Sequence, residues 1–178
     1  VFMNALNMFD GINLQSTIYS FIVFTSIYLF FLDSIMIKIL IIFLIGFSYL
    51  NYRNKSFLGD SGTLALAFII GYFFIRLYNL DLIQNADEIV IYMIIPGLDL
   101  IRLFVIRIFR KRNPLSSDRL HLHHLIISKY SFKTTIIIIS LLIIIPIVLN
   151  YFDFKNFYNL LITIVLYSST LLIIKKNT

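Results

Sequence analysis

Long apolar runs recur along the whole chain and limit what it can fold into more than any other feature. A helix needs about 20 residues to cross roughly 30 Å of hydrocarbon at 1.5 Å per residue. Hydrophobic residues make up 60% of the 178 residues and charged residues only 13%, which is typical of membrane proteins. We predict an all-α, polytopic membrane protein with about six transmembrane helices. The runs are residues 14–32, 35–50 and 64–78, a fourth that begins at Glu88, and residues 134–149 and 157–174.

Pro96 and Gly97 interrupt the fourth run. Proline lacks the backbone N–H and its ring crowds the preceding turn, so we expect this helix to be kinked or broken near Pro96-Gly97. Beyond it, charged residues fall within a sector of roughly 140° on a helix, which indicates a face exposed to water. Asp99 and Arg102 could also pair with each other, three residues apart. The sector holds Asp99, Arg102, Arg107 and Arg110.

The charges predict the topology. The net charge is +6. In a membrane protein, basic residues first indicate which side of the membrane each loop occupies, so we do not expect nucleic-acid binding. If residue 10 faces the cytoplasm and all six runs cross, 11 of the 15 Lys and Arg residues lie on the cytoplasmic side, as the positive-inside rule requires. Asp10, Asp60 and all three histidines then share that side. The eleven are Arg53, Lys55, Arg107, Arg110, Lys111, Arg112, Arg119, Lys129, Lys133, Lys175 and Lys176.

Residues 57–63, Phe-Leu-Gly-Asp-Ser-Gly-Thr, form a short polar stretch between two apolar runs. Gly59 and Gly62 let the backbone turn tightly beside a ligand. A carboxylate such as Asp60 suits a magnesium ion shared with a phosphate, because Mg²⁺ takes few protein ligands. The alternative is a plain turn in which Asp60 or Ser61 is the N-cap of the next helix.

Asn4, Asn7 and Asp10 are spaced by three residues and would share one face of a helix. Amides donate and accept hydrogen bonds, so this face could bind a base or a sugar. The alternative is a frayed terminal helix whose polar residues are solvated.

His121, His123 and His124 are all the histidines of the chain. Such a cluster in a basic loop could bind a metal or donate to a diphosphate, and the alternative is an ordinary surface loop. Zinc is the weaker choice, because the chain has no cysteine and only Asp118 offers a nearby carboxylate. The arginines beyond Pro96 could clamp phosphate groups, or could be ordinary cytoplasmic charges.

These four stretches resemble the motifs of one family, in the family's order. Residues 4–11, Asn-Ala-Leu-Asn-Met-Phe-Asp-Gly, are similar to the Asn-Ala-x-Asn-x-x-Asp-Gly motif of the polyprenyl-phosphate N-acetylhexosamine-1-phosphate transferases, the membrane glycosyltransferase family 4. Residues 57–62 resemble its Phe-Met-Gly-Asp-[Ser/Thr]-Gly loop, and residues 96–99 its Pro-x-x-Asp segment. Residues 118–124 resemble its histidine loop, in the His-x-His-His form of the branch that initiates O-antigen, enterobacterial common antigen and teichoic acid.

The resemblance implies a reaction and a site. These enzymes transfer a HexNAc-1-phosphate from a UDP-sugar to undecaprenyl phosphate or another polyprenyl phosphate, release UMP, and initiate a cell-envelope glycan. By resemblance, Asp60 would hold Mg²⁺, with Mn²⁺ as an alternative, and Phe57 would stack on uracil. The other implied site residues are Asp10, His123 and His124 as catalytic residues, and Asn7, His121, Arg102 and Arg107 as substrate ligands. The resemblance also implies the bacterial inner (cytoplasmic) membrane, a site on its cytoplasmic face, and the bilayer as a partner; a homodimer is one arrangement to consider.

The chain departs from the family pattern in two places. The family usually continues with a second Asp-Gly after Gly11, and here Asn13 and Leu14 stand in those positions. The family's paired-aspartate motif lies upstream of these stretches, and the chain begins at Val1 without it. We therefore expect residues 1–178 to be one membrane-embedded transferase domain that is truncated at its N-terminus, and inactive alone.

Two other functions stay open. A truncated or degenerate homologue would bind nucleotide-sugar or lipid phosphate without catalysis. A transporter or channel fragment would place its polar residues at mid-bilayer, whereas the polar motifs here fall in expected loops, which argues against it.

Overall fold

The computed structural model describes residues 1–111, 113 and 120–176, and this part of the chain is helical. Two helices are short, α1 (Phe2–Phe9) and α6 (Leu122–Ile127). The long helices are α2 (Gln15–Phe30), α3 (Ile35–Tyr52), α4 (Gly59–Asn79), α5 (Ala86–Phe109), α7 (Phe132–Tyr151) and α8 (Asn156–Lys176).

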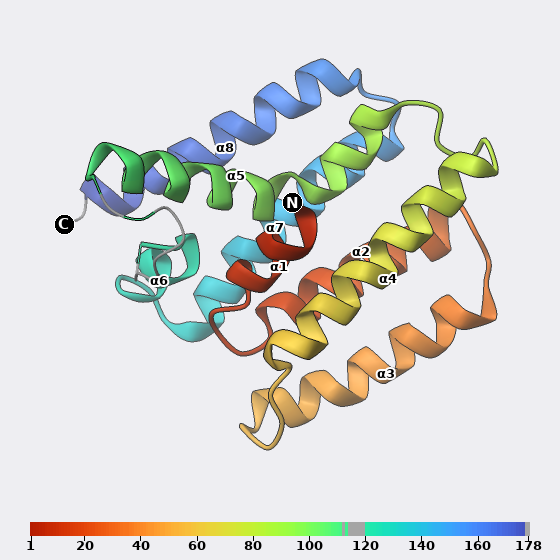
Figure 1. The fold of residues 1–178 in the computed structure, drawn as a ribbon, viewed down its shortest axis with the longest axis horizontal. Coiled ribbons are helices and arrows are strands. Elements are labelled where there is room, and N and C mark those ends of the chain that lie inside the picture. Colours follow the sequence, from red (N-terminus) through yellow and green to blue (C-terminus); the bar gives the residue numbers. More distant parts are fainter. Residues whose placement is uncertain (112, 114–119, 177–178) are drawn as a thin grey trace.

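The long helices confirm a polytopic membrane fold. Five of them (α3, α4, α5, α7 and α8) are long and apolar enough to cross a membrane, and α2, with 16 residues, is a shorter apolar helix. Figure 1 shows them running back and forth beside one another, with α3 at the edge of the bundle. Most of the side chains on α3 face outwards, as lipid contact requires.

Helix α5 passes through Pro96 without a break. The helix is continuous from Ala86 to Phe109, and Figure 1 shows its ribbon changing direction about half-way along. Proline leaves the carbonyl four residues earlier without its helical donor. That carbonyl belongs to Tyr92, and the buried Tyr19 hydroxyl of α2 donates to it at 2.9 Å. Of the two outcomes that the sequence allowed, the kink is the one found.

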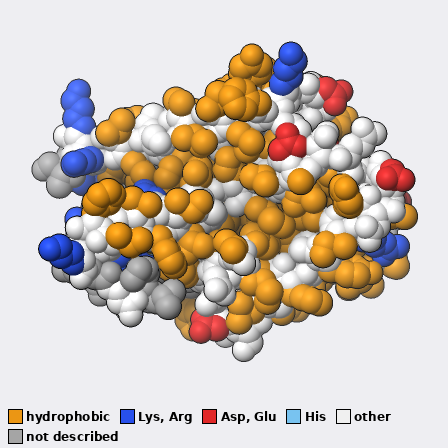
Figure 2. Space-filling view, turned by 45° about the horizontal axis from the view of Figure 1, so that its top comes forward, with side chains coloured by type: hydrophobic (Ala, Val, Ile, Leu, Met, Phe, Trp, Pro, Cys, Tyr) orange, Lys and Arg blue, Asp and Glu red, His pale blue; other side chains and the backbone are white. Residues whose placement is uncertain are grey.

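The polar motifs gather at one end of the bundle. Residues 10–14, the 53–58 loop and α6 lie at this end, and the loops 31–34, 80–85 and 152–155 lie at the other. Figure 2 shows a broad hydrophobic surface between the two ends, with most visible Lys and Arg side chains toward the end that holds α6. This separation is the one that the positive-inside count predicted.

Candidate functional site

Helices α1 and α4 bring the first two polar motifs together. The Thr63 hydroxyl, on the first turns of α4, donates to the Asn7 side-chain carbonyl on α1, and Thr63 is fully buried. A cavity of about 360 Å³ lies between the two motifs. Asn7 is thus tied into the fold, so α1 is not a frayed terminal helix. The cavity is lined by Asp10, Gly11, Ile12, Asn13, Asn51, Phe57, Leu58 and Gly59.

Asn51 builds this cavity, although it belongs to none of the polar motifs. Its side-chain carbonyl accepts from the Leu14 N–H at 2.6 Å, and its amide donates to the Ser56 carbonyl at 2.8 Å. One buried side chain therefore fixes the loop that follows the first motif and the loop that precedes the second. Leu14 has φ +70°, a conformation that favours glycine, and glycine is what the resembled family has there. No sequence signal marks Asn51, because it lies near the end of a largely apolar helix.

The second motif opens α4 without a side-chain cap. Gly59 has φ +63° and begins the helix, while Asp60 lies exposed in its first turn. Leu58 is the N-cap residue and makes no side-chain cap bond. The alternative in which Asp60 or Ser61 caps the helix is therefore wrong. The Asp60 carboxylate is therefore available to bind a ligand. The positive end of the helix dipole favours its negative charge.

Asp10 and Asp60 are close enough to interact. Burial raises the pKa of the Asp10 carboxyl, Ser16 opposes the rise, and the negative charge of Asp60 adds to it. Phe57, 67% exposed, stands at the edge of the same cavity. The site therefore offers two carboxylates and one aromatic face beside a polar hollow.

His123 lies against the first motif. A Cβ built on Gly11 would stand 1.8 Å from His123 Nε2, so only glycine leaves room for this imidazole. His123 is fully buried, and neither ring nitrogen has a hydrogen-bond partner in the described part of the chain. Burial lowers its pKa to about 3, helped by His124 and His121. The neutral ring is therefore the stable form at ordinary pH.

Asp99 holds the start of the histidine segment. Its Oδ2 lies 2.9 Å from His121 Nδ1, and its Oδ1 accepts from the Leu122 N–H at 3.1 Å. Oδ1 also accepts from Arg102 Nη2 at 2.7 Å, so the predicted pairing of Asp99 with Arg102 is confirmed. The rings of His123 and His124 follow, with centroids 4.2 Å apart.

Only part of the charged sector beyond Pro96 faces water, contrary to expectation: Arg110 is exposed, whereas Asp99 and Arg107 are buried. Asp99 and Arg107 are 2% and 1% exposed, and Asp99 is covered by residues of α6 and α8 that bond to it. Arg102 donates to Asp99, to the Leu120 carbonyl at 2.6 Å and to the Tyr167 hydroxyl at 2.9 Å. The phosphate-clamping roles of Arg102 and Arg107 stay predictions. Arg112, Asp118 and Arg119 lie outside the described residues.

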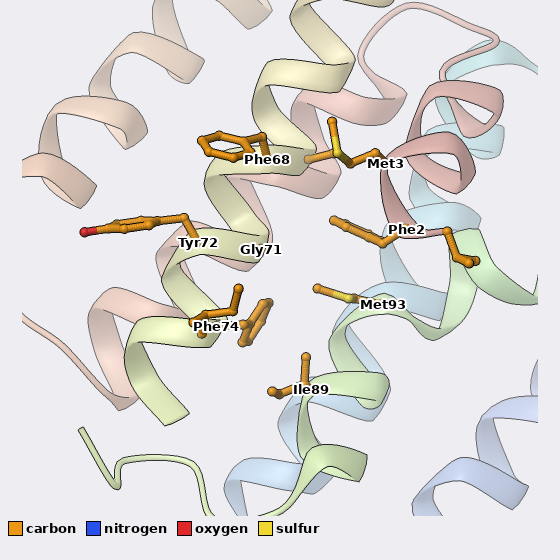
Figure 3. A pocket seen from close by; sticks show the side chains of 11 residues that line it. Phe2, Met3, Phe68, Gly71, Tyr72, Phe74, Ile89 and Met93 are labelled. Atoms are coloured by element: carbon orange, nitrogen blue, oxygen red, sulfur yellow. The ribbon is translucent and has the colours of Figure 1, made fainter. Parts of the chain in front are cut away.

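A second cavity lies apart from the polar one. It measures about 450 Å³ and opens between α1, α4 and α5, where Phe2, Phe68, Tyr72 and Met93 line it (Figure 3). Its lining is almost wholly apolar, so it suits hydrocarbon and not a nucleotide.

The chemistry of the polar cavity fits Mg²⁺. This ion is held by one or two carboxylates and completes its shell with water and phosphate oxygens, and Asp10 and Asp60 supply that number. Among the residues that the structure describes, no three His, Asp or Glu side chains form a cluster that could enclose a metal ion. The oxygen donors and their low number favour a magnesium shared with a substrate over a cation held by protein alone.

The fold and the site define the class: a polytopic helical membrane protein with a polar, carboxylate-bearing cavity at one end of its bundle. The comparisons agree. Residues 1–78, less than half of the chain, match the model of the family described as Glycosyl transferase family 4, which supports a membrane glycosyltransferase. The match spans the Asp10 and Asp60 motifs and ends before Asp99 and the histidines. No curated protein and no solved structure gave a significant match.

Proposed function

We propose that this protein transfers a HexNAc-1-phosphate from a UDP-sugar to undecaprenyl phosphate or a similar polyprenyl phosphate, releases UMP and so initiates a cell-envelope glycan. One observation carries the proposal: the cavity that joins Asp10 and Gly11 to Phe57 and Gly59, with Asp60 close by. Segments some 50 residues apart are brought together around one polar hollow at the end of the bundle. A soluble nucleotide and a lipid headgroup can both reach that level of a membrane.

The reaction needs mainly positioning and charge neutralisation. An acceptor phosphate oxygen attacks the phosphorus that carries the sugar, the bond from this phosphorus to UMP breaks, and UMP leaves with the electron pair. Asp60, with Asp10 beside it, would hold the Mg²⁺ that neutralises the diphosphate. Phe57 stacks on uracil and Asn7 lies toward the nucleoside, while His121, His123 and His124 border the diphosphate and sugar. The whole site faces the cytoplasm of a bacterial inner membrane.

The first test measures UMP release from UDP-GlcNAc by the full-length protein in membranes, with undecaprenyl phosphate, with and without Mg²⁺. We expect release that needs both the lipid and the metal ion. Asp60→Asn should lower it by about 100-fold or more, since the carboxylate that would hold the neutralising Mg²⁺ is lost. Asp81→Asn, an exposed carboxylate at the other end of the bundle, should leave it unchanged.

Two results would contradict the proposal. Wild-type turnover in Asp60→Asn would remove the metal assignment. No release with any UDP-HexNAc, from full-length protein that still binds UMP, would favour the binding-only homologue.

A further inference from the structure

A tyrosine of the last helix takes part in the network that holds the histidine segment. Tyr167 lies in α8 and is 4% exposed. Its hydroxyl donates to Asp99 Oδ1 at 2.8 Å and accepts from Arg102 Nε at 2.9 Å. Tyr167 belongs to none of the polar motifs, and it lies outside the residues that match the family model.

The two partners of Tyr167 fix the chain that enters α6. Arg102 binds the Leu120 carbonyl, while Asp99 binds the Leu122 N–H and the His121 ring. The same hydroxyl meets both partners, so it sets the distance and the angle between the carboxylate and the guanidinium. Burial makes each of these bonds matter, because an unpaired charged group in a dry site is costly.

Apolar contacts could not set this geometry as well. Between helices in a bilayer, hydrophobic burial gives little drive, and polar bonds and close packing decide how they dock. The Ser169 and Thr170 hydroxyls that follow Tyr167 on α8 donate to the Leu166 carbonyl of their own helix, whereas the Tyr167 hydroxyl ties α8 to the polar side of α5. Displacing it would let Asp99 and Arg102 move, and the first residues of α6 with them.

We propose that Tyr167 is a positioning residue: through Asp99 and Arg102 it holds His121 and the start of α6, and thereby keeps His123 seated against Gly11. The effect on turnover rests on the proposed function, whereas the effect on α6 does not. Tyr167 touches no reacting atom. Its role is to keep the histidine side chains at one fixed distance from the polar cavity.

The test replaces one hydroxyl and follows two independent signals in the full-length protein. Tyr167→Phe keeps the ring and removes the hydroxyl. Tyr158→Phe, on the same helix and 52% exposed, is the matched control. Amide hydrogen exchange of residues 121–127, referred to that of α3, reports the anchoring, and UMP release reports turnover.

We expect exchange in residues 121–127 to rise about tenfold in Tyr167→Phe, the effect of losing one hydrogen bond to a charged group, and to stay unchanged in Tyr158→Phe. We expect kcat to fall about tenfold with the KM for the UDP-sugar changed by less than about twofold, since misplaced groups slow the transfer more than binding. Arg102→Lys keeps the charge but loses the planar fork, and should give the same local loosening.

The outcomes separate this inference from the proposed function. Unchanged exchange and unchanged kcat in Tyr167→Phe would overturn the positioning role while leaving the transferase intact. If exchange rises only in residues 121–127 of Tyr167→Phe, and the wild-type protein releases no UMP, the anchoring is supported and the transferase is rejected. A lower thermal midpoint with exchange raised equally in α3 would show a general structural role and overturn the inference.

Discussion

Gly11 and His123 come from opposite halves of the chain and pack directly against each other. The glycine stands where a methyl group would strike the imidazole, at 1.8 Å from Nε2. The imidazole in turn fills the space that the missing side chain leaves, against a glycine that lines the polar cavity. A single packing contact thus connects the first and last motifs.

Gly11→Ala should therefore disrupt the site. The added methyl group must push His123 away, and overpacking of this kind costs about 1–3 kcal/mol. We expect a lower thermal midpoint and a loss of UMP release in membranes. Gly46→Ala in α3 is the matched control, because nothing lies within 4 Å of a Cβ there. Equal behaviour of the two variants would show that the Gly11–His123 contact is unimportant.

His123 predicts how stability depends on pH. Its pKa is lowered by burial from 6.5 to about 3, so between these values the unfolded chain binds a proton that the folded chain does not. Stability is then complete above pH 6.5 and falls as the pH decreases toward 3. Between pH 7.5 and pH 5 this one group should lower the free energy of unfolding by about 2 kcal/mol.

Thermal unfolding in detergent at the two pH values checks this expectation, with His123→Gln as the comparison. The variant cannot titrate here, so its midpoint should change less between pH 7.5 and pH 5 than that of the wild type. An equal pH dependence in both proteins would mean that His123 is solvated in the folded state.

At the scale of the element, α5 is the helix on which the bundle depends. Its proline bends it and frees the Tyr92 carbonyl, and Tyr19 of α2 meets that carbonyl in the buried core. After the bend, the Asp99 side chain accepts hydrogen bonds from residues of α6 and α8. One helix therefore connects the core to the histidine segment.

A double-mutant cycle on Tyr19 and Pro96 tests this arrangement. Tyr19→Phe leaves the Tyr92 carbonyl unpaired and should lower the free energy of unfolding by about 1 kcal/mol. Pro96→Ala restores the backbone N–H that can bond that carbonyl, so Tyr19→Phe should cost close to nothing in the Pro96→Ala protein. Denaturation in detergent gives the coupling energy. The same loss in both backgrounds would show that Tyr19 acts by packing alone.

At the scale of the whole molecule, charge and motif positions predict one orientation in the membrane. The end with α6 carries most of the Lys and Arg residues, and the chain contains no cysteine, so single-cysteine variants are easily made. Lys55→Cys and Ser128→Cys, both exposed, should react with a membrane-impermeant maleimide only from the cytoplasmic side. Gln84→Cys and Lys155→Cys should react only from outside. Labelling of Ser128→Cys from outside would reverse the topology.

Much of the fold could be predicted from the sequence, because crossing a membrane is a local requirement. The apolar runs predicted each long helix to within a few residues, and the loop charges predicted which ends lie together. Glycines beside carboxylates likewise marked Asp10 and Asp60, since tight turns need particular residues in sequence. Pro96 predicted the bend in α5 for the same local reason.

Other parts of the site depended on contacts between distant helices, which no local pattern reveals. Asp99, in the sector of α5 expected to face water, is buried, because residues of α6 and α8 bond to it. Asn51 and Tyr167 sit in apolar helices with no motif around them, and only their partners show what they do.

The sequence by itself determined the class of protein, the sequence position of its helices and the residues of its polar motifs, since these follow from hydrophobicity, spacing and backbone geometry along the chain. Only the tertiary structure decided that Asn51 joins two loops, that His123 takes the place of a side chain at Gly11, and that Tyr167 meets Asp99. Each of these is a fit between side chains from separate helices, and such a fit exists only once the helices have packed.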